Sequence, residues 1–247
     1  ASAEQPAEER TAEDASENET GAKSSAAGKE EVAEGENRIW SEPDSPYKYT
    51  WTPRTFSGFF YDLDNEVGSE TLTVNLQPND RSLKSGQLTY STKPEDTDFE
   101  FNDWGKYEVI GFMAEKYFAG YKASDFFKRD RSLINDGQLR KVLVDSDEEK
   151  TVTTGSVLAL EEGYELRIKQ IDLNGNKVYM ALAKDGDEID SKVVDPGNLD
   201  SSTYNYEVDV AGEDTSLILA HISNVFASTE SALVTIDGLF QISDTYA

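Results

Sequence analysis

The stretch WGKYEVIGFMAEKYFAGYK, residues 104–122, is the densest aromatic segment of the chain, with one Trp, three Tyr and two Phe. Its apolar residues occupy both odd positions, such as Tyr107 and Val109, and even positions, such as Ile110 and Phe118. A strand that is apolar on both faces is buried on both sides. We therefore expect core packing here, and the alternative is an aromatic platform that stacks on sugars.

Three residues of this stretch have special positions. Gly111 and Gly120 indicate a β-bulge or a close approach of two backbones, because glycine has no side chain to pack in a strand. Trp104 follows a run of polar residues. We expect Trp104 to be the exception to burial, with its ring exposed to solvent.

The chain from Ile39 onward repeats short segments of alternating apolar and polar residues, which is typical of strands. The clearest is 164–194, where Asn174-Gly175 and Asp185-Gly186 predict type I′ turns and a three-stranded meander. Helix signals are weak, and the best candidate is 124–143, where we expect a short helix or a turn with Asp136-Gly137 as its end signal. Further strands are expected at 50–62, 70–76, 86–92, 99–102, 141–145, 215–228 and 232–243.

These patterns predict an all-β fold, mostly antiparallel, with little helix. Residues 39–247 exceed the about 100 residues of one immunoglobulin-type sandwich, so we expect two β-sandwich subdomains. The first would combine residues 39–138 with 213–247, which makes it discontinuous in sequence. The second would comprise residues 139–212, the block that contains the hairpin-linked meander.

Residues 1–38 have a different composition from the rest. They contain no aromatic residue and one branched aliphatic residue, Val32, with 11 acidic and 4 basic side chains. Such a segment cannot bury enough apolar surface to offset its loss of conformational entropy, so we expect a disordered acidic linker or tail. A frayed helix is the alternative. Asn18 begins the one N-x-[ST] sequon of the chain and is a candidate glycosylation site.

Charge and residue types exclude several functions. The formal net charge is −26, so phosphate backbones and anionic lipid headgroups are repelled and no nucleic acid is expected as a partner. There are no cysteines and one histidine, His221, which we expect to be a buried, hydrogen-bonded residue of an apolar segment. We therefore expect no catalytic triad, no cofactor and no enzyme activity. A hydrolase that uses two carboxylates stays open, because spacing in sequence cannot reveal such a pair.

Two charged clusters are candidate binding residues. Asp62, Asp64 and Glu66 alternate as in a calcium loop, but the following glycine comes one position later than an EF-hand requires. They are weak candidates for binding a divalent cation.

The second cluster is basic and stands out against the acidic background. Lys122, Lys128, Arg129 and Arg131 lie within ten residues of one another. Their simplest role is a solvated loop. The alternative is a self-assembly contact, in which they meet an acidic surface on another copy of the chain.

The segment 104–121 is similar to a signature of archaeal surface-layer (S-layer) tile domains of the Methanosarcina type. Three more segments resemble this family: SGFFYDLDNEVGSETLTV at 57–74, residues 154–190, and IDGLFQISD at 236–244. The resemblance extends over residues 40–244, and the ordered set of segments is more specific than any one of them.

The resemblance implies a pair of β-sandwiches, an extracellular location and self-assembly into a porous two-dimensional lattice that acts as an acidic, charge-selective sieve. It implies a second tile repeat in the full-length protein, membrane contact through a C-terminal anchor outside these residues, and no catalytic residues. The alternative function is a secreted carbohydrate-binding module, in which Trp40, Trp51 or Trp104 would lie exposed in a flat row.

Overall fold

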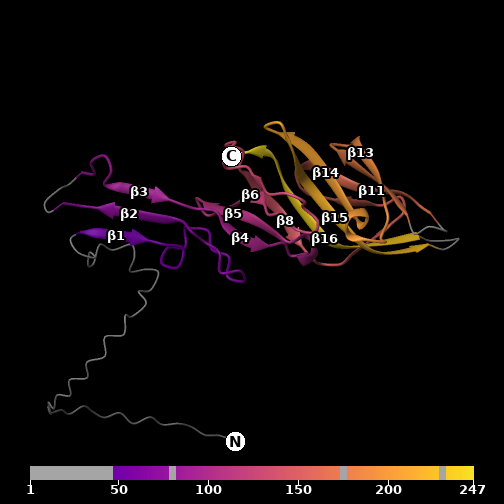
Figure 1. The fold of residues 1–247 in the computed structure, drawn as a ribbon, viewed down its shortest axis with the longest axis horizontal. Coiled ribbons are helices and arrows are strands. Elements are labelled where there is room, and N and C mark those ends of the chain that lie inside the picture. Colours follow the sequence, from indigo (N-terminus) through magenta and orange to yellow (C-terminus); the bar gives the residue numbers. More distant parts are fainter. Residues whose placement is uncertain (1–46, 78–81, 173–176, 228–231) are drawn as a thin grey trace, which may run out of the picture. The chain divides into compact units, whose positions relative to one another are not determined.

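The computed structural model describes residues 47–77, 82–172, 177–227 and 232–247, which form almost entirely antiparallel β-structure (Figure 1). Within these ranges, helix is limited to α1 (Leu199–Ser202) and two 3₁₀ turns, η2 (Asn102–Trp104) and η3 (Glu161–Gly163). The predicted all-β fold with little helix is confirmed. The described part contains no helix long and apolar enough to cross a membrane. The segment 1–38 with Asn18, Trp40 and the predicted turn Asn174-Gly175 lie outside the described residues.

The strands of the described residues form three sheets. The three-stranded sheet has the order β1 (Lys48–Trp51), β2 (Thr71–Asn75), β3 (Leu88–Ser91). The four-stranded sheet has the order β10 (Val157–Ala159), β11 (Tyr164–Ile171), β12 (Val178–Lys184), β13 (Asp187–Val194). The nine-stranded sheet has the order β14 (Thr203–Val210), β15 (Glu213–Ala227), β16 (Ala232–Tyr246), β8 (Arg140–Ser146), β6 (Glu115–Tyr121), β5 (Lys106–Phe112), β4 (Glu95–Asp98), with β7 (Arg131–Ser132) beside β6 and β9 (Lys150–Thr153) beside β16.

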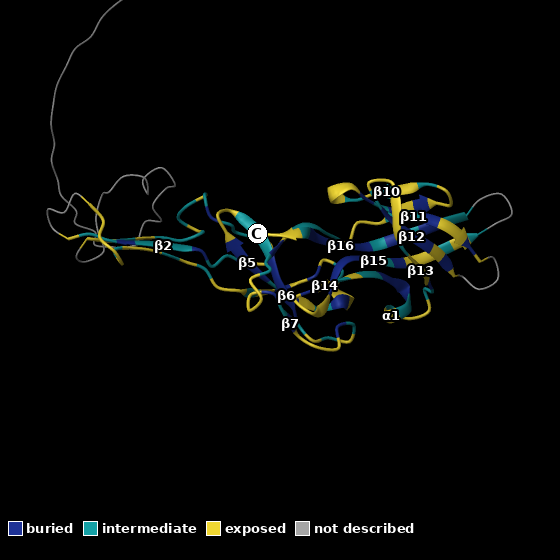
Figure 2. Ribbon diagram, turned by 90° about the horizontal axis from the view of Figure 1, so that it is seen from above, coloured by how far each residue is buried: buried dark blue, intermediate teal, exposed yellow. Residues whose placement is uncertain are grey.

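The aromatic stretch forms the hairpin β5–β6 in the nine-stranded sheet, not one continuous strand. Met113 and Ala114 have φ angles of 51° and 70°, the positive values that a two-residue type I′ turn needs at both central positions. Tyr107 and Phe118 are fully buried. Figure 2 shows buried residues concentrated along both strands.

One ring from the last strand of the chain covers this hairpin. The ring centroid of Phe240 lies 4.8 Å from that of Phe99, 5.2 Å from that of Tyr107 and 5.8 Å from that of Phe118. The Tyr107 hydroxyl donates to Asp145 Oδ2 on β8 at 2.6 Å, so the buried phenol keeps a partner. Burial raises the pKa of the Asp145 carboxyl, although this hydrogen bond opposes the shift.

Trp104 is fully buried, so the prediction that its ring is exposed is wrong. The residue ends η2, and this turn places the ring against Phe101 and Phe99, with centroid distances of 4.9 Å and 5.7 Å. Its indole N–H donates to Thr203 Oγ1 at 3.2 Å. Trp104 can be buried despite its polar neighbours because its one polar atom has a partner from a distant strand.

Of the short helix or turn expected at 124–143, the structure has turns, together with β7 and the start of β8, and no helix. The Ser124 hydroxyl accepts hydrogen bonds from the backbone N–H groups of Phe126 and Phe127 at 3.2 Å and 3.0 Å. Local bonds of this kind compete with a helix. Phe127 and Leu133 are both buried, which fixes the segment against the sheet.

The predicted meander is present as β11, β12 and β13, and β10 adds a fourth strand. Asp185 and Gly186 have φ angles of 52° and 94°, as the predicted turn requires. Leu166, Ile168 and Met180 point into the core, where each is at most 1% exposed. Their alternation with polar neighbours follows the period of two that a strand with one buried face has.

The strand pairing bears on the two expected subdomains. The described residues between 47 and 247 belong to one compact unit. In the nine-stranded sheet, β8 pairs with β16 and β14 pairs with β15. Strands from the expected second sandwich, 139–212, therefore share a sheet with strands from the expected first sandwich, 39–138 plus 213–247. The division into these two sandwiches stays a prediction.

A buried carboxylate connects the three-stranded sheet to the hairpin. Glu70 is fully buried and accepts hydrogen bonds from the N–H groups of Phe60 and Met113 at 2.5 Å and 2.8 Å, and from the Tyr90 hydroxyl at 2.8 Å. Burial of the Tyr90 phenol and its hydrogen bond to Glu70 raise the pKa of Tyr90 to about 12. These three hydrogen-bond donors compensate the burial of the Glu70 carboxylate. One of them is the backbone N–H of Met113, which lies in the turn with positive φ.

Gly120 is the position in the hairpin that tolerates no side chain. The register shifts between Glu108 and Val109, opposite Gly120, which is the bulge that the glycine indicates. Gly120 has a φ of 149°, and a Cβ atom there would lie 1.8 Å from the carbonyl oxygen of Arg131. The β6–β7 pairing therefore depends on the absence of a side chain at this position.

We expect Gly120→Ala to lower the free energy of unfolding by more than about 3 kcal/mol, because it adds a backbone clash to the strain of positive φ. Gly137→Ala is the matched control, since Gly137 also has positive φ but its Cβ would meet nothing within 4 Å. It should cost about 1 kcal/mol. Urea unfolding of both variants measures the difference, and equal losses would contradict this account of the bulge.

Candidate functional site

The predicted basic cluster lies on and beside the loop that connects β6 to β7. Two local hydrogen bonds shape this loop. The Ser124 hydroxyl donates to the carbonyl oxygen of Trp104 at 2.8 Å, and the N–H of Ala123 donates to Asp130 Oδ1 at 2.7 Å. The Phe127 ring stacks on that of Tyr121, with centroids 3.9 Å apart. The loop is therefore anchored to the core, and Lys128 and Arg129 are exposed on it.

Lys122 is committed to contacts within the chain. Its ammonium lies 2.6 Å from Glu108 Oε1 and 3.8 Å from Asp96 Oδ1. The hydrogen bond with Glu108 raises the pKa of Lys122. An ammonium held by two carboxylates has less attraction left for an acidic partner surface.

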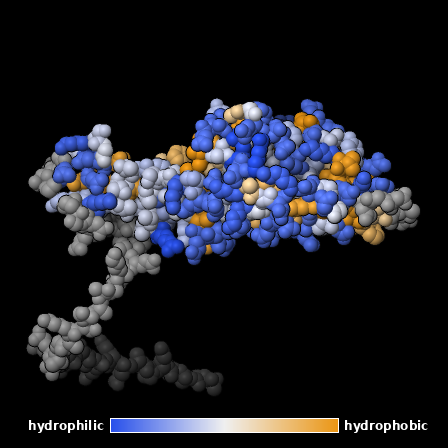
Figure 3. All heavy atoms as spheres, viewed as in Figure 1, coloured by the Kyte–Doolittle hydropathy of each residue, from blue (hydrophilic) through white to orange (hydrophobic). Residues whose placement is uncertain are grey.

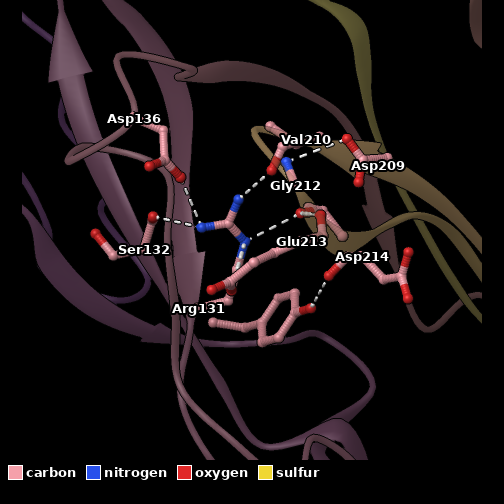
Figure 4. Close-up of polar contacts among 10 residues, drawn as sticks. Arg131, Ser132, Asp136, Asp209, Val210, Gly212, Glu213 and Asp214 are labelled. Carbon is pink, nitrogen blue, oxygen red and sulfur yellow. Dashed lines mark hydrogen bonds and ion pairs between the residues drawn. The ribbon is translucent and has the colours of Figure 1, made fainter.

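Arg131 is a buried structural residue (Figure 4). Its Nη1 donates to Asp136 Oδ2 at 2.7 Å and to the carbonyl oxygen of Ser132 at 2.9 Å. Its Nη2 donates to the carbonyl oxygen of Val210 at 2.8 Å, and its Nε donates to Thr215 Oγ1 at 3.2 Å. The guanidinium thus joins the β7 region to the β14–β15 hairpin and is not available to another copy.

Lys128 and Arg129 line a groove of about 480 Å³. The lining also includes Tyr121 and the two phenylalanines of the loop, together with carboxylates from β14, β15 and α1. The ammonium of Lys128 lies 3.6 Å from Asp200 Oδ2. Arg129 has no ion-pair partner among the described residues. The acidic lining residues are Asp200, Glu207 and Asp214.

Of the predicted assembly contacts, the structure therefore leaves one unpaired cation, Arg129, beside one weakly paired cation, Lys128. The carboxylates of the groove were not identified from the sequence. In the sequence, these carboxylates come about 70 to 85 residues after the loop. They come from α1, β14 and β15, and no local sequence pattern predicts that these elements line the groove beside the loop.

The weak metal candidates do not converge. Asp62 Oδ1 accepts from the N–H groups of Asp64 and Asn65 at 3.1 Å and 3.2 Å, and Lys116 lies 3.7 Å from Oδ2. Although burial opposes it, the bonds from Asn65 hold the pKa of Asp62 below its usual range. Asp62 therefore closes its own turn, while Asp64 and Glu66 are exposed. In the described ranges, no three acidic or histidine side chains are arranged to hold a metal ion.

His221 lies beside a second groove, of about 330 Å³, whose lining includes Asp237. Its Nδ1 lies 2.5 Å from Asp237 Oδ1, and its ring stacks on Phe101 with centroids 4.2 Å apart. Glu100 also lines this groove, and burial and the charge of Asp145 raise the pKa of Glu100. The histidine is hydrogen-bonded and largely buried, as expected for a packing residue.

The surface offers no row of exposed tryptophans in the part that the structure describes. Trp104 is buried, and Trp51 is half-buried near Tyr49, with ring centroids 6.3 Å apart. Figure 3 shows a face dominated by hydrophilic residues, with apolar residues in separate spots. An arrangement of this kind does not favour a flat sugar-stacking platform.

We expect Arg131→Met to lower the free energy of unfolding by about 3–5 kcal/mol, because it leaves the carboxylate of Asp136 and a buried carbonyl without their partner. Arg129→Met, two residues away and exposed, should change it by less than about 0.5 kcal/mol. Thermal and urea unfolding of the two variants measure the difference. A loss below 1 kcal/mol for Arg131→Met would contradict the structural role.

Comparisons with known proteins identify relatives over almost the whole described region. A family model described as S-layer protein matches residues 41–247. The chain is 33% identical over 202 residues to the Major S-layer protein of Methanosarcina acetivorans, and 34% identical over 199 residues to that of Methanosarcina barkeri. It is 30% identical over 218 residues to the Major S-layer protein of Methanosarcina mazei.

The matches cover most of this chain but a small part of the relatives. They include 78% of this chain for the M. acetivorans and M. barkeri proteins and 86% for the M. mazei protein. The chain spans 28–29% of the length of these three relatives. Because the family model extends over more than four-fifths of the sequence, the chain belongs to the S-layer protein family.

Proposed function

We propose that this chain is a structural tile of a cell-surface layer and that it self-assembles, within its full-length protein, into a porous two-dimensional lattice. The observation that carries the proposal is the match of residues 41–247 to the S-layer protein family. An extracellular location follows from this role. The role is structural, so the chain is not an enzyme and needs no catalytic residue.

A further tile repeat in the same full-length chain fits the lengths. The match accounts for 28% of the M. acetivorans protein, which leaves ample length for other repeats. Membrane contact in this proposal comes only through a C-terminal anchor outside these residues. Symmetric contacts repeated in a plane generate an extended sheet of copies.

The acidic composition gives the lattice its selectivity in this proposal. A formal net charge of −26 produces a negative potential around every pore. Polyanions are then excluded, while cations and small neutral solutes pass. Bound divalent cations that reduce repulsion between copies belong to this proposal as weak, delocalised partners.

The full-length protein tests this function directly. Electron microscopy should show ordered planar arrays, and dextrans of equal size should cross membranes coated with them in the order cationic, neutral, anionic. The difference between charged probes should shrink at high salt, where the Debye length falls to about 3 Å at 1 M. A protein that stays monomeric at high concentration, with and without divalent cations, would contradict the proposal.

A further inference from the structure

The strand β13 is an open edge of the four-stranded sheet. It pairs with β12 on one side, and no described strand pairs with its other side. Six of its eight residues are exposed, whereas β14, an edge strand of the same length, has two. Figure 2 shows the exposed residues near its label. Such an edge presents unpaired N–H and C=O groups that another strand can bind.

The side chains of β13 are unusual for an exposed edge. Ile189 and Val193 are 43% and 62% exposed. Between them lie Asp190 and Lys192, which carry opposite charges on either side of Ser191. The sequence around Ser191 is therefore symmetric in chemical type: apolar, charged, hydroxyl, charged, apolar.

This symmetry matches an antiparallel pair of two identical strands. A two-fold axis through Ser191 puts Asp190 opposite Lys192 of the second copy, and Ile189 opposite Val193 of the second copy. The same contacts then occur twice, as in any two-fold interface. Opposite charges and apolar side chains that face each other across two strands stabilise the pairing.

Neighbouring registers are less favourable. Pairing centred on Asp190 or on Lys192 places that residue opposite its own copy, which is a like-charge contact. Pairing centred on Ile189 places Glu188 opposite Asp190. Of the registers centred on residues 189–192, the one centred on Ser191 alone brings no like charges together within β13.

The two charged side chains are held in position by contacts of the same chain. The Tyr204 hydroxyl donates to Asp190 Oδ2 at 2.5 Å. Lys192 Nζ donates to the carbonyl oxygen of Asn205 and lies 5.7 Å from the centroid of the Tyr204 ring. A carboxylate has further acceptor positions and an ammonium has three donors, so both can bind a second copy as well.

We propose that β13 pairs with β13 of a second copy, antiparallel and centred on Ser191. The inference rests on the proposed function, because it supplies one of the contacts by which copies join in a lattice. The register shift between the partners of Leu182 and Ala183 leaves Ile189 as an extra residue, which shortens the straight part of the edge. A short ladder between strongly acidic copies makes a weak contact in solution, and many such contacts add up in a lattice.

Disulfide formation by single cysteine variants tests the pairing. The chain has no cysteine of its own, so every disulfide must join the introduced residues. Facing residues of antiparallel strands have Cα atoms about 4.5–5.5 Å apart, within the range of a disulfide. Under mild oxidation, Ser191→Cys should form a covalent dimer at least tenfold faster than Ser91→Cys. Ser91 is the matched control, since it is also an exposed serine on an edge strand whose hydroxyl contacts a neighbouring strand.

The register has its own test. An equimolar mixture of Ile189→Cys and Val193→Cys should form mixed dimers faster than either variant forms dimers alone. All of these positions are exposed, and circular dichroism before oxidation confirms that each variant is folded. Ser191→Cys that dimerises no faster than Ser91→Cys would overturn the proposal, as would a mixture that links no faster than its components.

Array formation by the full-length protein separates this inference from the proposed function. Arrays together with unlinked Ser191→Cys would overturn the β13 contact and leave the S-layer role standing. Rapid linking of Ser191→Cys without arrays would support the contact and contradict the lattice.

Discussion

The packing of Phe240 against the rings of the β5–β6 hairpin is the interaction on which the rest of the fold depends. It joins the last strand of the chain to its middle, with the ring centroid of Phe240 5.2 Å from that of Tyr107 and 5.8 Å from that of Phe118. Each such pair adds about 0.5–1.5 kcal/mol beyond the burial of apolar area. A chain with a formal net charge of −26 needs this apolar core, since its surface charges repel one another on folding.

The basic and the acidic side chains differ in where they lie. Many basic residues are bound within the chain, as shown by Lys122 with Glu108 at 2.6 Å and Arg131 with Asp136 at 2.7 Å. The acidic excess stays on the outside. This distribution suits a tile whose proposed lattice excludes polyanions, and it restricts contact between copies to places where opposite charges or uncharged side chains meet. The edge of β13 and the groove beside Arg129 are two such places.

The sequence predicts the meander well because its signal is local, but the strands expected at 50–62 and 99–102 are wrong: most of the first segment forms turns, and the second is a bend that leads into η2. Alternating residues and the Asp185-Gly186 turn are enough to place β11, β12 and β13. The hairpin turn at Met113-Ala114 could not be predicted, because neither residue favours positive φ, and the buried acceptor Glu70 that holds it lies 43 residues away. Trp104 was placed outside because its sequence neighbours are polar, whereas Thr203, its hydrogen-bond partner, comes from another strand.

The same reasoning applies to the candidate site. Four basic residues look alike in sequence, but Arg131 is buried because Val210 and Thr215, 79 and 84 residues further on, accept its hydrogen bonds. The symmetric pattern of β13 is readable from the letters alone. Its status as a sheet edge is not, because that depends on which strands pair.

Hydrogen exchange across the folded chain tests the central claim that the aromatic hairpin is the core and that function resides on the surface. We predict that the amides of Tyr107, Val109 and Phe118 exchange only through global unfolding, at rates that no added polysaccharide changes. Exchange in this hairpin that is faster than at the exposed edge β13, or that slows when a polysaccharide is added, would contradict it.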